Sequence, residues 1–239
     1  MRPIAIFRHF RSEGPGYFAI FLERHGIPWQ LIAVDEGRGI PGSPAAYSGL
    51  CFMGGPMSVN DPLPWIADAC SIIRQAVASD IPVIGHCLGG QLISKALGGV
   101  VSRNPRKEIG WGEAESVPGP DAAQWLGDFV DRKLTVFQWH GETFSIPPQA
   151  SRILASAYCA NQMFTRGPHL AMQCHVEMTP EMITKWSKGW DDEVCGMAEL
   201  PASIQNPATM GAEAGEKLPV MRTLADQLYS VWIQGLKKD

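Results

Sequence analysis

The chain has 239 residues, of which 45% are hydrophobic and 18% are charged, and its formal net charge at pH 7 is −4. These values are typical of a globular protein, and the length suits one α/β domain with additions. The negative net charge and the absence of a basic run argue against nucleic acid as a partner. No apolar stretch approaches the roughly 20 residues that cross a bilayer, which argues against a membrane protein.

The N-terminus and the cysteines bear on location and cofactors. The sequence from Met1 to Phe7 enters a strand-like run at once and lacks the apolar core and cleavage site of a signal peptide, so we expect a cytoplasmic protein. No two cysteines have the C-x-x-C spacing of zinc or thioredoxin-like sites, and we therefore expect no metal and no organic cofactor. The six cysteines are Cys51, Cys70, Cys87, Cys159, Cys174 and Cys195.

Strands and helices are expected to alternate in the first half of the chain. Apolar runs predict strands at 3–9, 29–34 and 50–53, and a short buried strand that begins at Ile81. Helical periodicity and turn signals predict helices at 17–25, 64–79 and 88–97. This order is typical of a parallel sheet that helices cover on both faces.

The second half of the chain has a different pattern. Strands are predicted at 100–117, 133–144, 152–157 and 169–174, the first two with the alternation of antiparallel or edge strands. A turn is expected at 118–121. A helix is expected at 179–188, because Thr179 is a good N-cap and Pro180 suits the first helical position.

Residues 189–239 are expected to be all-helical. An apolar stripe along the last segment predicts that this helix packs against the rest of the protein. The stripe consists of Leu218, Met221, Leu224, Leu228 and Trp232. We therefore divide the chain into a domain of residues 1–188 and a helical extension of residues 189–239 that packs on the same domain.

A glycine-rich turn follows the strand that begins at Ile81. The sequence Gly85-His86-Cys87-Leu88-Gly89 is the cysteine form of the nucleophile elbow, in which the nucleophile lies on a sharp turn between a strand and a helix. Glycines two residues before and after Cys87 avoid a collision across the turn. The helix N-terminus favours a thiolate and offers the Leu88 N–H to a developing oxyanion. A buried structural cysteine is the alternative interpretation.

A nucleophilic cysteine needs a base and a third group that orients the base. Two His-x-Glu pairs are available, His140–Glu142 and His175–Glu177, and residues two apart on a strand point to the same side. The second pair follows a predicted strand, at the sheet edge where α/β proteins build their sites, so we assign the base to His175. We expect His140 to line the pocket. Either histidine could instead be a hydrogen-bonded structural residue.

Four segments together carry a family resemblance. They are Met53-Gly54-Gly55-Pro56, Gly85-His86-Cys87-Leu88-Gly89-Gly90-Gln91, Trp139-His140-Gly141-Glu142 and Gln173-Cys174-His175-Val176-Glu177. In this order they resemble the oxyanion loop, nucleophile motif, pocket segment and Q-x-H-P-E segment of class I (triad-type) glutamine amidotransferases. The resemblance covers roughly residues 3–188. Val176 replaces the usual proline, and residues 189–239 match no common feature of the family.

The resemblance implies a fold and a reaction. The fold would be a flavodoxin-like α/β fold, with an open, mostly parallel sheet flanked by helices, an antiparallel section and a helical C-terminal appendix. Cys87 would attack the side-chain amide of glutamine, or a γ-glutamyl group, and form a thioester. His175 would act first as base and then as acid toward the leaving amine, and Glu177 would orient the imidazole ring.

The resemblance also implies binding roles for residues around the triad. The oxyanion would meet backbone N–H groups of Gly54, Gly55 and Leu88, each donor contributing ~3 kcal/mol to the transition state. Gln91 would contact the bound glutamine, and His140 would line the substrate pocket.

The segment after residue 188 is too short to be an ammonia-acceptor domain. The chain also lacks a G-x-x-x-x-G-K-[ST] phosphate loop and the S-G-G-x-D-S motif of ATP-using synthetases. We therefore expect a stand-alone enzyme that acts on glutamine or a γ-glutamyl compound and releases ammonia, or one that passes ammonia to a separate acceptor subunit. The alternatives are a γ-glutamyl peptide hydrolase and, from another class, a non-catalytic regulatory module on the same scaffold.

Overall fold

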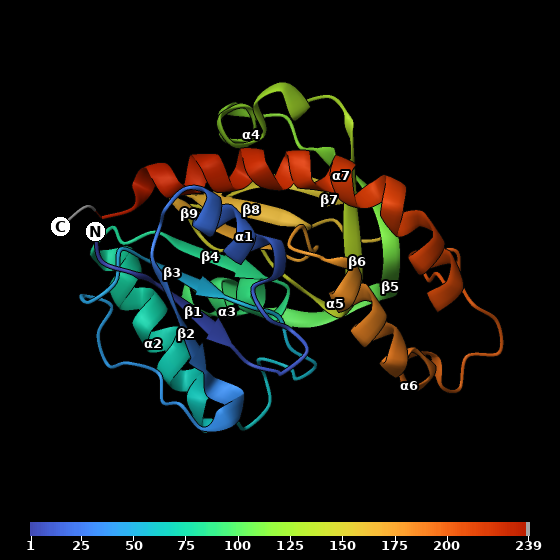
Figure 1. Cartoon of the computed structure of the whole chain (residues 1–239), viewed down its shortest axis with the longest axis horizontal. Coiled ribbons are helices and arrows are strands. Elements are labelled where there is room, and N and C mark those ends of the chain that lie inside the picture. Colours follow the sequence, from blue (N-terminus) through green and yellow to red (C-terminus); the bar gives the residue numbers. More distant parts are fainter. Residues whose placement is uncertain (238–239) are drawn as a thin grey trace.

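A single mixed sheet forms the centre of the protein, whose computed structural model describes residues 1–237. The sheet has nine strands in the order β2-β1-β3-β4-β9-β8-β7-β5-β6, with helices on both faces (Figure 1). The predicted α/β architecture is confirmed. The strands are β1 (Ile4–Arg8), β2 (Trp29–Ala33), β3 (Gly49–Phe52), β4 (Val83–His86), β5 (Val101–Ser116), β6 (Lys133–Phe144), β7 (Ser151–Ser156), β8 (Met163–Arg166) and β9 (His169–Met172).

One half of the sheet is parallel. Strands β2, β1, β3, β4 and β9 pair in parallel, with Cys51 opposite Ile84 and Gly85 opposite Ala171. Strands β3, β4 and β9 are buried along their whole length, which explains why their sequences are continuous apolar runs rather than alternating ones. The carboxyl ends of β3, β4 and β9 therefore meet at one edge of the sheet.

The other half of the sheet is antiparallel. The long strands β5 and β6 pair from Val101 opposite Phe144 to Glu115 opposite Lys133, with a register shift between Arg103 and Glu108. Strand β6 also reaches the parallel half, since the backbones of Phe137 and His175 exchange two hydrogen bonds of 3.0 and 2.8 Å. This contact fixes the segment that follows β9 against the middle of β6.

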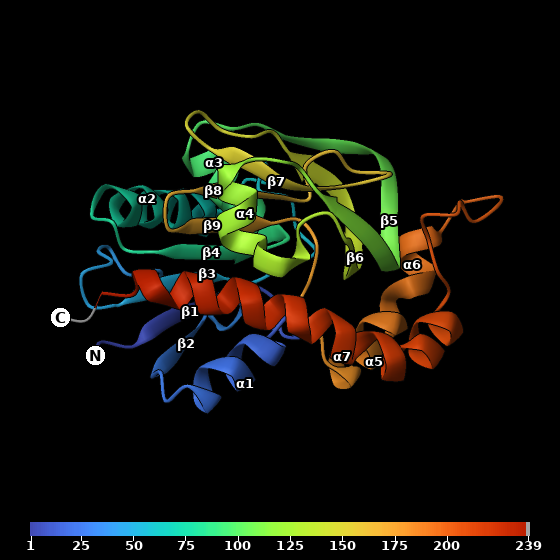
Figure 2. The same ribbon diagram turned by 90° about the horizontal axis from the view of Figure 1, so that it is seen from above.

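The helices cover both faces of the sheet. Helices α2 and α3 share one apolar core with the sheet, and α1, α4, α5 and α7 share the core on the opposite face. Figure 2 shows α7 running along the molecule beside α1. The helices are α1 (Gly16–Arg24), α2 (Pro64–Ala78), α3 (Leu88–Ala96), α4 (Pro120–Leu126), α5 (Pro180–Trp186), α6 (Trp190–Val194) and α7 (Pro207–Trp232).

Helix α7 is part of the main core. It begins at an Asn206 N-cap and contacts α1, α4, α5, β5 and β6. The five residues of its predicted apolar stripe, from Leu218 to Trp232, are all buried. Residues 238–239 of the predicted extension lie outside the described residues. Among the helices of the described chain, none combines the length and apolar character needed to cross a membrane.

Three local predictions are wrong or incomplete. The predicted turn at 118–121 leads into helix α4, because Pro120 occupies the first helical position and is already set to the helical φ. Residues 195–206, predicted to be helical, form a connection that contains Gly196 in the left-handed region and Pro201. Strand β8 has only four residues and was not predicted.

Candidate active site

Cys87 lies on the sharp turn between β4 and α3. Its backbone has φ 50° and ψ −107°, a strained conformation for a residue other than glycine. A side chain at Gly85 would collide with the backbone of Gly89, so the glycines permit the turn as predicted. The Cys87 N–H donates to the Met172 carbonyl at 2.8 Å, which ties the turn to the end of β9.

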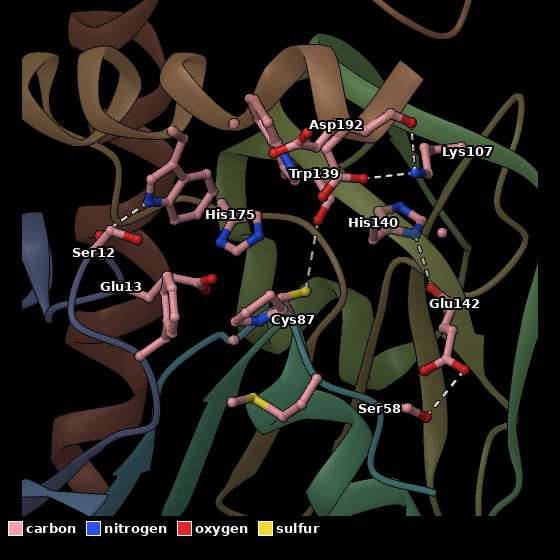
Figure 3. Close-up of a pocket in the computed structure, with 18 of the residues that line it drawn as sticks. Ser12, Glu13, Ser58, Cys87, Lys107, Trp139, His140, Glu142, His175 and Asp192 are labelled. Carbon is pink, nitrogen blue, oxygen red and sulfur yellow. Dashed lines mark hydrogen bonds and ion pairs between the residues drawn. The ribbon is translucent and has the colours of Figure 1, made fainter. Parts of the chain in front are cut away.

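A cavity of about 560 Å³ opens beside this turn. Of the predicted site residues, Gly55, Cys87, Gln91, His140 and His175 line it (Figure 3). Gly54, Leu88 and Glu177 lie in contact with the lining residues rather than on the wall. The cavity therefore brings together residues that are up to 120 positions apart in the sequence.

His175 and Glu177 form a hydrogen-bonded pair behind the cavity wall. His175 Nδ1 lies 2.7 Å from Glu177 Oε1, and both side chains are 1% exposed. The other carboxylate oxygen accepts a 2.9 Å hydrogen bond from the Val176 N–H. A proline at position 176 could not make this bond, because proline has no N–H. The substitution of the usual proline thus gives the carboxylate an additional donor.

The two groups change each other's protonation. Burial alone lowers the pKa of His175, but the adjacent Glu177 carboxylate and Cys87 outweigh it, so this pKa lies well above its usual value. Burial alone raises the pKa of Glu177, but the imidazoles of His86 and His175 outweigh it and lower this pKa to about 2. At neutral pH Glu177 is therefore ionised, and His175 readily accepts a proton.

The other ring nitrogen of His175 faces the cavity. Within residues 1–237, this Nε2 atom is buried and has no hydrogen-bond partner. The Cys87 sulfur faces the same cavity (Figure 3) and accepts a 3.5 Å hydrogen bond from Gln173 Nε2. A free imidazole nitrogen beside a thiol is the arrangement that a base and a nucleophile require.

Behind Glu177 lies a pair that the sequence did not indicate. His86 Nε2 is 3.8 Å from Glu177 Oε2 and 3.0 Å from the hydroxyl of Tyr229, which belongs to α7. Both side chains are fully buried. Burial lowers the pKa of His86, and the neighbouring Glu177 carboxylate opposes this shift. The His86 side chain does not line the cavity, and Tyr229 follows His86 by 143 residues in the sequence. No local sequence pattern therefore indicates the pair.

His140 belongs to a separate network on the cavity wall. Its Nδ1 lies 2.9 Å from the Glu142 carbonyl, and its Nε2 lies 3.2 Å from Glu108 Oε2. The same Glu108 carboxylate accepts hydrogen bonds from Ser156 at 3.0 Å and from Gln162 at 2.9 Å.

This network includes the group of described residues whose spacing best fits a metal ion. It consists of Glu108, His140 and Cys159, whose ligand atoms lie within 4.8 Å of one another. Because hydrogen-bond donors already occupy the Glu108 carboxylate, we interpret the group as a buried polar network that holds His140 against the cavity.

Gln91 lines the cavity and is 3% exposed. Its Nε2 donates to Gln173 Oε1 at 3.2 Å, and Gln173 in turn donates to Cys87. The two amides therefore connect helix α3 with the nucleophile.

Glu13 is a cavity residue that the sequence reading missed. It lies on the connection between β1 and α1, directly before the Gly14-Pro15-Gly16 turn, and its carboxyl group points toward His175 and Cys87 (Figure 3). Burial raises the pKa of Glu13 to about 7, His175 opposes this, and Glu177 and Glu193 add to it. A carboxyl group next to a glycine turn is common, so the sequence offers no signal that it faces a site.

The fold and the site together define a class of protein: a mixed α/β sheet with a cysteine elbow at the carboxyl end of a central strand and a His–Glu pair at the end of its neighbour. The family model described as glutamine amidotransferase class-I matches residues 28–185. The chain belongs to this family.

Known relatives agree with this assignment. The glutamine amidotransferase-like protein YfeJ of Salmonella typhimurium is 30% identical over 181 residues, which cover 73% of this chain and 75% of that protein. Gamma-glutamyl peptidase 2 of Arabidopsis thaliana is 28% identical over 178 residues, or 70% of each chain. The crystal structure of a glutamine amido transferase from Methylobacillus flagellatus superposes with a TM-score of 0.94 at 40% identity, covering 100% of this chain and 97% of that one.

Proposed function

We propose that the protein hydrolyses the side-chain amide of glutamine, or of a γ-glutamyl compound, through a thioester on Cys87. The observation that carries this proposal is the convergence of Cys87 with the His175–Glu177 pair on one cavity. The raised pKa of His175 makes its free Nε2 a strong acceptor for the thiol proton.

The first half of the reaction forms the thioester. The Cys87 sulfur attacks the amide carbon, the thiol proton passes to His175 Nε2, and the carbonyl oxygen becomes an oxyanion. Backbone N–H groups of Leu88 and of the Gly54–Gly55 loop would stabilise this oxyanion. When the carbon–nitrogen bond breaks, His175 returns the proton to the leaving nitrogen, and ammonia or an amine departs.

The second half hydrolyses the thioester. Water attacks the thioester carbon, His175 takes its proton, and the carbon–sulfur bond breaks to release the acid and restore Cys87. Glu177 stays ionised throughout and holds the imidazole with Nε2 toward the cavity. The site residues complete both halves without an acceptor domain.

A γ-glutamyl peptide is the second candidate substrate. The cavity of about 560 Å³ lies in the range of sites that bind drug-sized ligands, which exceeds the needs of a single amino acid. The similarity to gamma-glutamyl peptidase 2 supports the same candidate. The two candidate substrates are distinguished by comparing the rate of ammonia release from glutamine with the rate of cleavage of a γ-glutamyl dipeptide.

Labelling with diazo-oxo-norleucine, a glutamine analogue with an electrophilic carbon, tests the proposal. We expect one covalent adduct, on the peptide that contains Cys87, and none in Cys87→Ala. The exposed Cys195 is the internal control, because a reagent that reacts only by accessibility would modify it first. Labelling confined to Cys195, or unchanged turnover in Cys87→Ala, would refute the proposal and favour a non-catalytic protein.

A further inference from the structure

Glu13 lies on the cavity wall and its carboxyl group points at the reacting groups (Figure 3), but the mechanism above has no use for it. Its side chain is half-buried and lines the same cavity as Cys87 and His175. Burial and nearby charges are the only influences on its pKa, and no hydrogen bond within residues 1–237 involves its carboxyl group. A partly buried carboxyl group that points at reacting groups and has no protein donor is available to a bound ligand.

The backbone around Glu13 is held in place independently of the carboxyl group. The Ser12 carbonyl accepts a 3.0 Å hydrogen bond from Trp186 Nε1, and the Tyr17 N–H donates to the Glu177 carbonyl at 2.8 Å. Gly16 has φ +49°, and a side chain there would collide with the same Glu177 carbonyl. The connection between β1 and α1, which contains Glu13, therefore packs against the segment that contains His175 and Glu177.

The carboxyl group lies between the oxyanion loop and the imidazole ring. A side chain at Gly54 would collide with Glu13 Oε2, and His175 Cε1 lies only 3.4 Å from the same point. The Glu13 carboxyl group and the Cε1 side of the imidazole ring therefore lie near the same point, and the Nδ1 atom of the ring is already bonded to Glu177. Within residues 1–237, Glu13 makes no hydrogen bond to a ring nitrogen of His175 and so does not orient the imidazole as Glu177 does.

In the substrate pose that the proposed mechanism requires, this position would border the leaving group. The amide oxygen would point to the N–H groups of Leu88 and the Gly54–Gly55 loop, and the amide nitrogen to His175 Nε2. Since Cε1 is bonded to Nε2, a group beside Cε1 also borders the place of the leaving nitrogen. His175 supplies that nitrogen with one proton, but the hydrogens that it already carries need acceptors.

We propose that Glu13 accepts a hydrogen bond from the leaving nitrogen and thereby makes the site selective for γ-amides over γ-esters. This inference rests on the proposed function. Glu13 forms no covalent bond and transfers no proton; the proton that the nitrogen gains comes from His175. An ester oxygen in the same place has no hydrogen to donate and gains nothing from the carboxylate.

Two substrates with the same glutamyl part test the proposal: glutamine and the γ-methyl ester of glutamate. We expect Glu13→Met, which has similar length and no acceptor oxygen, to lower kcat/KM for glutamine by about 10- to 100-fold. The same variant should lower kcat/KM for the ester by less than about threefold, because that transition state lacks the hydrogen bond. Glu13→Gln, which keeps an acceptor oxygen, should lose less activity toward glutamine than Glu13→Met.

Glu142→Gln is the matched control, since Glu142 also lines the cavity but already accepts a 3.1 Å hydrogen bond from Ser58. It should leave the ratio of the two kcat/KM values unchanged. Equal losses of Glu13→Met toward both substrates, or no loss toward glutamine, would overturn the proposal. A wild-type protein that cleaves neither substrate and is not labelled at Cys87 would instead refute the proposed function itself.

Discussion

At the scale of single residues, the two cavity histidines are held by different partners. His175 has Nδ1 on the Glu177 carboxylate and Nε2 free toward the cavity. His140 has Nδ1 2.9 Å from the Glu142 carbonyl, and its Nε2 makes no hydrogen bond within residues 1–237 but lies 3.2 Å from the Glu108 carboxylate. The base must also lie beside the thiol, and Cys87 acts directly on the pKa of His175. His175 is therefore the base in our account, and His140 is part of the wall.

Alanine substitutions of the two histidines separate these roles. We expect His175→Ala to lower kcat by about 1000-fold or more, because the proton acceptor and the acid for the leaving amine are both lost. His140→Ala should act less, and mainly on KM. Steady-state kinetics with glutamine measures both, and the reverse order of effects would show that the base was assigned to the wrong residue.

The depressed pKa of Glu177 predicts a pH dependence of stability. The pKa is about 2 in the folded protein and 4.5 for an unperturbed glutamate, so the stabilisation is complete above pH 4.5 and is lost as the pH falls toward 2. The loss amounts to about 3 kcal/mol for a shift of this size.

Urea unfolding between pH 6 and pH 2.5 measures this loss. The difference in unfolding free energy between the wild type and Glu177→Gln should shrink as the pH falls. Glu113→Gln removes an exposed carboxylate paired with Lys133 and should keep the wild-type pH dependence. A constant difference between the wild type and Glu177→Gln would mean that the pKa of Glu177 is not lowered in the folded protein.

At the scale of elements, helix α7 extends the support of the site. The hydroxyl of Tyr229 on this helix lies 3.0 Å from His86 Nε2, which in turn borders the Glu177 carboxylate. We infer that this contact positions Glu177 from behind.

Tyr229→Phe removes only the hydroxyl group and so tests its contact with His86 Nε2. We expect a loss of stability of about 1 kcal/mol and a several-fold lower kcat with little change in KM. Tyr17→Phe is the matched control, because the Tyr17 hydroxyl donates to Asp226 on the same helix at 2.9 Å but does not face Glu177. An equal drop in kcat for both variants would assign the effect to helix docking instead of to His86.

The elements differ in how far the sequence predicts them. The elbow, its two glycines and the His175–Glu177 pair were predictable because each is a short local pattern with a specific chemistry. The positions of Glu13 and Tyr229 next to the site were not, because they arise where a loop and a distant helix meet it. Helix α4 and strand β8 were missed because four to seven residues carry too little periodicity to outweigh the turn residues beside them.

At the scale of the whole molecule, α7 shares the core of one sheet face. Trp232 is fully buried, and its ring packs against Phe18 of α1 with centroids 5.7 Å apart. We therefore propose that the division into residues 1–188 and 189–239 is one of sequence only, and that both parts unfold together.

Trp232→Ala should test this cooperativity. We expect a single unfolding transition, with the free energy of unfolding lowered by about 3–5 kcal/mol and activity lost in the same transition. Val220→Ala changes a residue of the same helix that is 53% exposed and should cost less than about 0.5 kcal/mol. A separate early transition of the variant that leaves activity intact would show that α7 is an independent appendix.

In the proposed reaction, glutamine loses ammonia and its γ-glutamyl group becomes attached to Cys87 as a thioester. The most direct measurement is the intact mass of the protein mixed with glutamine and quenched in acid within the first turnovers, followed by peptide mapping. We predict a mass increase of one γ-glutamyl group, located on the peptide that contains Cys87 and absent from Cys87→Ala. Steady release of ammonia without this adduct, and at the same rate in Cys87→Ala, would contradict the account.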